Sequence, residues 1–102
     1  MRRIRISRTY EHELEELLAQ GLRRFGVAVV ERKRDLVNDI IEQFLAVHPV
    51  RAVDPILGIW SYPVTGAPFV LLYDFDDQEL RIHLIIHAGA GRRLIDLSTV
   101  EW

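Results

Sequence analysis

Two apolar segments, 69–75 and 80–87, are separated by only four polar residues, and this pair constrains the fold more than any other feature. Both alternating sets of side chains in 69–75 are apolar, which is typical of a central strand that is covered on both faces. The residues between the two segments, Asp76-Asp77-Gln78-Glu79, favour a turn. The sequence therefore predicts an antiparallel β-hairpin at this point.

The second of these segments carries polar side chains at alternate positions. Leu80, Ile82, Leu84 and Ile86 alternate with Arg81, His83, Ile85 and His87. Because successive side chains of a strand point to opposite faces, Arg81, His83 and His87 are expected to share one face. Two interpretations of that face remain open: a patch that binds a target, or the ordinary wet face of a sheet that is packed on one side.

The first half of the chain has the apolar spacing of helices. Tyr10, Leu14, Leu17 and Leu18 predict a helix over about 9–20, and Gly21 and Gly26 predict a break over 21–26. A longer helix is expected over about 27–47, since Pro49 ends the pattern there. Each helix has one apolar face to bury, so we expect an antiparallel helical hairpin.

The remaining segments complete an α+β fold of the order β-α-α-β-β-β. Strands are expected at 3–7 and at 59–64, the second an edge or bulged strand because of Pro63. The loop 49–58 and the turn 65–68 connect the elements, and 92–102 is a C-terminal tail whose conformation the pattern does not define. We predict one domain, 1–102: a twisted antiparallel sheet of four strands with the helical hairpin on one face and the other face free to bind a macromolecule.

Composition excludes several classes of function. The net charge is −2, with no concentrated basic field of the kind that drives sequence-independent binding to nucleic acid. The chain has no cysteine, so disulfides and thiolate metal sites are excluded. It has no apolar run long enough to span a bilayer, and the basic N-terminus is followed by charged residues rather than a signal-peptide core. A cytoplasmic protein with no membrane contact is expected.

Neither the histidines nor the acidic residues predict a metal centre. His83 and His87 lie four residues apart on a strand, too far for easy chelation, and no third ligand is evident. The spacing of the acidic residues around 74–79 does not follow a calcium loop, and a solvated turn explains them. We expect no metal and no small-molecule cofactor.

The order of the elements, with a histidine near the end of the last strand, resembles the RelE/ParE family of bacterial toxins. The stretches that carry the resemblance are Arg3-Ile4-Arg5-Ile6-Ser7, the Leu14/Leu17/Leu18 helix, Trp60-Ser61-Tyr62, Phe69-Val70-Leu71-Leu72-Tyr73-Asp74 and Leu80 to His87 followed by Arg92. The resemblance implies a small cytoplasmic toxin that inhibits growth or stabilises a plasmid. It also implies a cognate antitoxin encoded by an adjacent gene.

The family has two branches, and the residues favour one of them. RelE-like members cleave mRNA in the ribosome, for which His83 or His87 would act as acid or base and Arg81 or Arg92 would hold phosphate. Such members tend to carry an arginine early in the strand that here reads Phe69 to Tyr73, and this sequence has none there. We therefore expect the ParE-like mode, in which the protein binds DNA gyrase. A degenerate toxin that only binds its antitoxin is a third reading.

Six residues are candidates for contact with a target or partner: Arg81, His83, His87, Arg92, Arg93 and Trp102. The tandem arginines follow the last strand, and a tryptophan at the end of the tail must either dock on its own domain or be covered by a partner. The antitoxin is expected to fold on binding and to bury apolar grooves between helices and sheet. The sequence therefore predicts at least one exposed apolar groove on the isolated chain.

Overall fold

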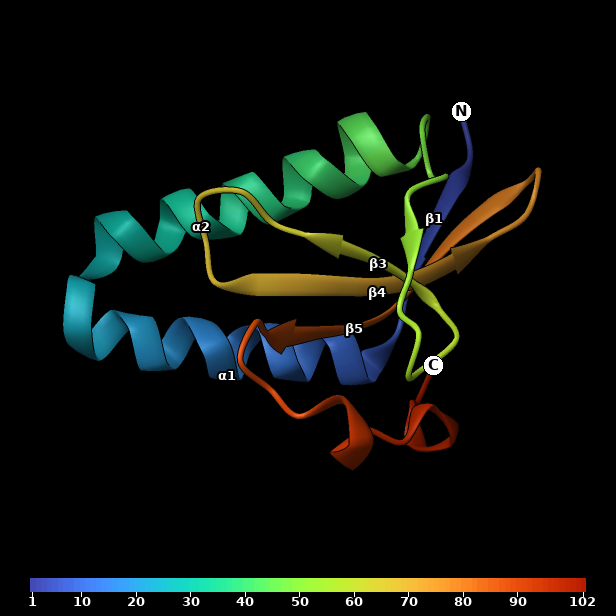
Figure 1. The fold of residues 1–102 in the computed structure, drawn as a ribbon. Helices are drawn as coiled ribbons and strands as arrows, with labels where there is room; N and C mark the ends of the chain where they lie inside the picture. Colours follow the sequence, from blue (N-terminus) through green and yellow to red (C-terminus); the bar gives the residue numbers. More distant parts are fainter.

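The computed structural model describes all residues 1–102 as two layers, a five-stranded sheet and a pair of helices that covers one of its faces (Figure 1). The elements are β1 (Arg3–Ile6), α1 (Arg8–Phe25), α2 (Val27–Asp39), β2 (Ala52–Val53), β3 (Trp60–Pro63), β4 (Phe69–Phe75) and β5 (Glu79–His87). The strands lie in the order β1-β5-β4-β3-β2. This confirms the predicted α+β class and the helical hairpin on one face. None of the helices has the length and apolarity to span a bilayer.

The sheet is mixed rather than antiparallel throughout, which corrects the sequence-based prediction. Strands β2 to β5 pair antiparallel, but β1 pairs parallel with β5, with Arg3 opposite Glu79 and Ile6 opposite Ile82. The two-residue β2, inside the predicted loop 49–58, adds a fifth strand at the opposite edge. Alternation in a short strand shows which side chains are buried but not the direction in which the strand runs, so the sequence could not indicate this pairing.

The first helix continues through the predicted break at 21–26. It begins at Ser7, whose Oγ accepts a hydrogen bond from the Tyr10 N–H at 2.8 Å, and it ends only at Phe25. The turn between the helices rests on Gly26 alone, which has φ +85° and ψ 173°. The second predicted helix is α2 followed by a six-residue π-helix, Ile40–Leu45. The predicted hairpin is present, with a shorter turn than the glycines suggested.

A β-bulge in β5 breaks the predicted alternation of its side chains. Leu72 of β4 lies opposite Leu84, and Tyr73 lies opposite Ile82, so His83 is an extra residue between the two pairs. An inserted residue shifts the alternation of a strand by one position, so every side chain after it points to the face opposite the one expected. Leu80, Ile82 and Ile85 therefore pack under the helices, while Leu84 packs on the opposite face. The expectation that Leu80, Ile82, Leu84 and Ile86 share a face was wrong for this reason.

The second face of the sheet is covered by the end of the chain, which corrects the prediction that this face is free. Ile59, Val70, Leu72 and Leu84 form a buried cluster there. Two short 3-10 helices, Arg92–Leu94 and Leu97–Thr99, lie in the segment that covers it, and this segment contributes Ile95, Leu97 and Val100. Figure 1 shows the segment, in red, between the end of β5 and the C-terminus. The tail thus packs against the folded core, with Ile95, Leu97 and Val100 partly buried.

Candidate functional site

Five of the six candidate residues lie in three separate places rather than in one site, and the sixth, Arg93, is exposed. Arg81 and His83 lie with Trp102 near the middle of β5, Arg92 lies at the β2–β3 loop, and His87 lies at the end of β5 against the helices. The bulge at His83 causes part of this separation, because it places Arg81 and His87 on opposite faces of the sheet. The single polar face predicted for Arg81, His83 and His87 is therefore absent.

Arg81 is neutralised by acidic residues of its own hairpin. Its Nε lies 2.7 Å from Oδ1 of Asp74, and its Nη1 lies 2.9 Å from Oδ2 of Asp76 and 3.3 Å from Oε1 of Glu79. Arg81, with the backbone N–H groups of Gln78 and Glu79, lowers the pKa of Asp76 to about 2. The acidic partners in turn raise the pKa of Arg81. A guanidinium held by three carboxylates has little positive charge left for a phosphate.

His83 is enclosed by the end of the chain. The ring of Trp102 meets the His83 ring edge-on, with centroids 4.8 Å apart, and the Arg5 guanidinium stacks on the Trp102 ring at 4.9 Å. Nε2 of His83 lies 3.3 Å from Oδ1 of Asp74 but makes no hydrogen bond, and neither does Nδ1. Trp102 therefore docks on its own domain, the first of the two fates expected for it.

Arg92 fastens the C-terminal segment to the β2–β3 loop. Its Nε donates to Oδ2 of Asp54 at 3.0 Å, and its Nη1 donates to the carbonyl of Ala90. Asp54 is only 8% exposed, and its other oxygen accepts the N–H groups of Ile56 and Leu57. These two donors and Arg92 lower the pKa of Asp54, the Leu57 N–H contributing most. Arg93, in contrast, is exposed and forms no ion pair.

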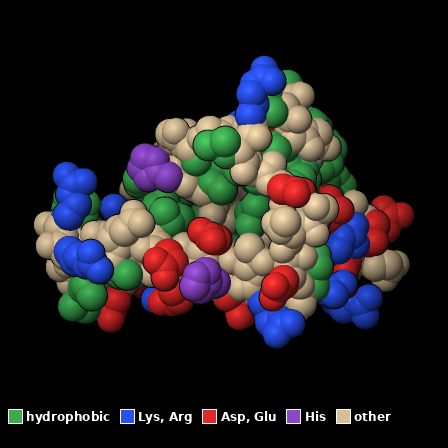
Figure 2. All heavy atoms as spheres, turned by 90° about the horizontal axis from the view of Figure 1, so that it is seen from below, with side chains coloured by type: hydrophobic (Ala, Val, Ile, Leu, Met, Phe, Trp, Pro, Cys, Tyr) green, Lys and Arg blue, Asp and Glu red, His purple; other side chains and the backbone are tan.

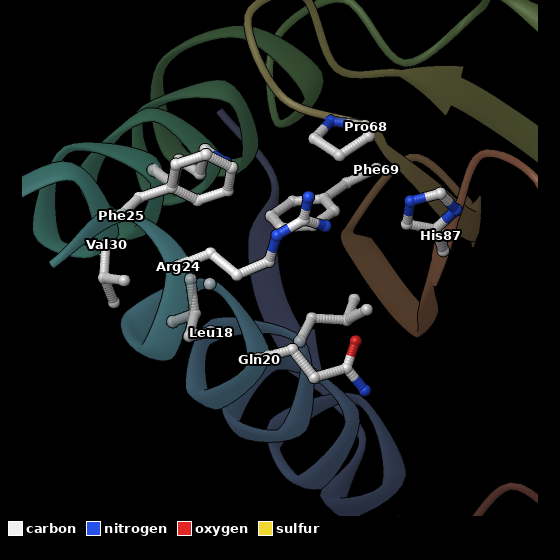
Figure 3. Close-up of a pocket in the computed structure, with 11 residues that line it drawn as sticks. Leu18, Gln20, Arg24, Phe25, Val30, Pro68, Phe69 and His87 are labelled. Atoms are coloured by element: carbon white, nitrogen blue, oxygen red, sulfur yellow. The ribbon is translucent and has the colours of Figure 1, made fainter.

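His87 lines a cavity of about 100 Å³ between the helical hairpin and the end of the sheet (Figure 3). Its Nδ1 accepts a hydrogen bond from the N–H of Gly89 at 3.1 Å, so Nε2 carries the proton of the neutral ring. We call this cavity the hairpin groove. It is lined by Leu17, Leu18, Gln20, Gly21, Arg24, Phe25, Val30, Lys33, Pro68, Phe69 and His87.

The hairpin groove is the exposed apolar groove between helices and sheet that the sequence predicted. The sequence pattern did not point to its cations, Arg24 and Lys33, because the pattern does not show which helix charges lie beside the sheet. One signal was available: Phe25 continues the apolar stripe of Leu14 and Leu18 at helical spacing, and it lies between two arginines and the turn glycine. Phe25 is 54% exposed, and Nζ of Lys33 and the Arg24 guanidinium carbon lie 4.9 Å and 5.5 Å from the centroid of its ring.

No cluster of three or more His, Cys, Asp or Glu side chains is arranged to hold a metal ion. Of the four residues considered for RNA cleavage, only Arg81 and His83 lie together, both beside Asp74. Arg81 and Arg92 are paired with carboxylates, His83 lies under Trp102, and His87 faces the helices.

Comparisons with known proteins give similarities both in structure and in sequence. No protein-family model matches the chain. A chain from the chromosomal ParDE TA system of P. aeruginosa superposes with a TM-score of 0.64 at 18% identity, over 85% of this chain and 96% of that chain. The DNA-directed RNA polymerase subunit beta'-beta'' of Cyanidioschyzon merolae (strain NIES-3377 / 10D) is 30% identical over 105 residues, which is 83% of this chain but 6% of that subunit. The structural match shows that the chain shares the fold of a ParDE protein.

Proposed function

We propose that this protein is the toxin of a type II toxin–antitoxin pair and that it acts in the ParE-like mode, by binding a macromolecular target such as DNA gyrase. The observation that carries the proposal is the shared fold with a chain of the ParDE TA system, which extends over 96% of that chain. The partner is an antitoxin encoded by an adjacent gene, and the proposed site of action is the cytoplasm. The RNA polymerase match spans too little of that subunit to lend its activity to this chain.

The dispersal of the candidate groups supports binding rather than RNA cleavage. Cleavage needs a base, an acid and free cations around one phosphate, all within hydrogen-bond reach of the reacting atoms. In this chain the three carboxylates around Arg81 would repel a phosphate, and the guanidinium of Arg92 is already paired with the carboxylate of Asp54. A ParE-like mode needs no such constellation.

Induced expression tests the toxin role directly. Growth should stop when the chain is produced alone and should continue when the product of the adjacent open reading frame is produced with it. Growth that is unaffected by the chain alone would contradict the toxin role and favour the degenerate reading, in which only antitoxin binding survives.

The ribonuclease alternative has its own test in the same cells. Ribosome-bound mRNA should remain intact during the growth arrest, and the variant His87→Ala should arrest growth as the unmodified chain does. Cleavage of the mRNA that His87→Ala abolishes would reverse the preference and make the protein a RelE-like enzyme.

A further inference from the structure

We propose that the chain contacts its protein target through a group of aromatic and basic side chains beyond the C-terminal end of α2. The group consists of Phe44, His48, Arg51 and Tyr62, and we call it the Arg51 cluster. Its occupant is an apolar patch of the target that carries a carboxylate for Arg51. This inference rests on the proposed function, since there is a target only if the chain is a toxin.

Three side chains of the Arg51 cluster converge on the ring of Phe44. The guanidinium carbon of Arg51 lies 4.1 Å from the centroid of that ring, and it lies 6.0 Å from the centroid of the Tyr62 ring. The ring centroids of Tyr62 and His48 lie 5.7 Å and 5.9 Å from that of Phe44. Many basic side chains of the chain are unpaired, so it is the contact with two rings from different elements that distinguishes Arg51.

The backbone that carries the Arg51 cluster is held by hydrogen bonds. Phe44 lies in the π-helix Ile40–Leu45, and π-helices are rare and recur at functional sites. The N–H of His48 donates to the carbonyl of Phe44 at 2.7 Å, and the carbonyl of Pro49 accepts a hydrogen bond from the hydroxyl of Tyr73. A surface that is already ordered loses little conformational entropy when it binds a partner.

The segment that carries His48 and Arg51 also exposes apolar side chains. Val47 is 46%, Val50 67% and Val53 49% exposed. Tyrosine and arginine are enriched among the residues that dominate binding energy at protein interfaces, and the contacts around them exclude water. A planar guanidinium pairs with a carboxylate through two N–H donors. The cluster and its valines are therefore complementary to an apolar protein patch that carries a carboxylate.

The same features favour a protein target over RNA. Arg51 covers the ring of Phe44, which Tyr62 and His48 also contact, so that ring offers no open face to a base. Figure 2 shows acidic side chains among the basic ones on the face seen from the side of α1, so this face has no continuous basic track for a polyanion. Exposed valines find apolar partners on a protein surface but not on a sugar-phosphate backbone.

The Arg51 cluster and the hairpin groove lie at opposite ends of α2 (Figure 1). Phe44 follows the C-terminal end of this helix, whereas the groove lies beside the α1–α2 turn. Substitutions in the cluster should therefore change contact with the target and leave binding of the antitoxin intact.

Growth arrest by variants of the full chain tests the Arg51 cluster. Arg51→Ala should need at least about tenfold more of the chain, measured by immunoblot, to arrest growth as the unmodified chain does. The matched control is Arg3→Ala, which removes the same charge from an exposed arginine of β1, outside the cluster. Arrest by Arg51→Ala at the amount that suffices for the unmodified chain would overturn the proposal, and so would an equal loss in Arg3→Ala.

Two further variants separate contact with the target from charge and from folding. Arg51→Lys keeps the charge but not the planar guanidinium, so it should also weaken the arrest. Val50→Asp should weaken it too, whereas Leu94→Asp, at a position that is 90% exposed in the C-terminal segment, should not. Full arrest by Arg51→Lys and Val50→Asp would overturn the proposal.

Antitoxin binding provides the control for folding. Each variant should still co-purify with the product of the adjacent open reading frame. Loss of that partner together with the arrest, in both Arg51→Ala and Val50→Asp, would overturn the target surface, because the cluster would then serve the fold or the antitoxin.

The unmodified chain separates failure of this inference from failure of the proposed function. If the unmodified chain does not arrest growth, the toxin role is wrong and the target surface falls with it. If it arrests growth and the cluster variants arrest growth equally well, the target surface alone is overturned. Cleavage of ribosome-bound mRNA that Arg51→Ala abolishes would also overturn it, since the occupant of the cluster would then be RNA.

Discussion

Two tyrosine hydroxyls are buried in the core, and only one of them has a hydrogen-bond partner. The hydroxyl of Tyr73 donates to the carbonyl of Pro49 at 2.6 Å, whereas the hydroxyl of Tyr10 has no partner in the protein. Burial raises the pKa of Tyr73 to about 12 and raises that of Tyr10 as well. A buried polar group without a partner costs stability, so the two residues contribute differently although their side chains are the same.

Removing each hydroxyl should therefore give different results. Tyr73→Phe leaves the buried carbonyl of Pro49 unpaired and should lower the free energy of unfolding by about 1–2 kcal/mol. Tyr10→Phe removes a desolvated group without a partner and should leave that free energy unchanged or raise it by up to about 1 kcal/mol. Urea unfolding followed by circular dichroism measures both, and an equal loss in the two variants would contradict the hydrogen-bond assignment.

The pKa of Asp76 gives a prediction about acid stability. Its pKa falls from 3.8 to about 2 on folding, so ionised Asp76 contributes stability above pH 3.8 and this contribution is lost as the pH falls to about 2. Asp76→Asn cannot titrate, so its stability should fall less than that of the unmodified chain across this range. Urea midpoints measured at both ends of the range show the difference, and parallel curves for the two proteins would contradict the contact with Arg81.

At the scale of single residues, the sequence predicted which residue types matter but not their partners. Arg81 and Arg92 were candidates for contact with a target because the sequence pattern does not show which acidic residue, if any, pairs with an arginine on a strand or after it. The structure pairs the first with residues of the hairpin turn and the second with Asp54, 38 positions away. Such pairs depend on register and loop conformation, which the local pattern does not contain.

At the scale of elements, the helical hairpin depends on one glycine. Gly21 and Gly26 looked alike in the sequence, but Gly21 is an ordinary helical residue of α1 and only Gly26 has a positive φ. The combination of φ +85° and ψ 173° at Gly26 lies in a region that residues with a Cβ rarely adopt. Glycine spacing alone cannot separate these two roles, which is why the predicted break was too long.

Alanine substitutions should separate the two glycines by the sign of their effect. Gly26→Ala should lower the free energy of unfolding by about 1–3 kcal/mol, because it strains the turn. Gly21→Ala should raise it by up to about 1 kcal/mol through helix propensity, since the new Cβ would lie 3.7 Å from Cγ2 of Val30, an ordinary contact distance. Thermal unfolding of both variants provides the measurement, and a loss at both positions would contradict the assigned conformations.

At the scale of the whole molecule, the C-terminal segment closes the second face of the sheet. Its backbone also completes the start of α1, because the Glu101 carbonyl accepts hydrogen bonds from the N–H groups of Arg8 and Thr9. The sequence held part of this information: Val70 and Leu72 already predicted a strand covered on both faces, and two helices can cover only one. What covers the second face could not be predicted, since Ile95, Leu97 and Val100 follow neither a helical nor a strand period.

Truncation of two apolar residues of this segment should change stability to different extents. Trp102→Ala loses the contacts with His83 and Arg5 and should lower the free energy of unfolding by about 1–3 kcal/mol. Leu94→Ala serves as the control, because Leu94 is 90% exposed and its loss should change stability little. Urea unfolding compares them, and a Trp102→Ala variant as stable as the unmodified chain would show that the segment does not hold the second face.

Inhibition of DNA supercoiling by purified gyrase tests the proposed mode of action most directly. The proposed ParE-like mode predicts that the purified chain, added in increasing amounts, stops supercoiling and that its antitoxin restores it. Supercoiling that continues at every concentration of the chain, under conditions in which the same preparation cleaves ribosome-bound mRNA, would contradict the account.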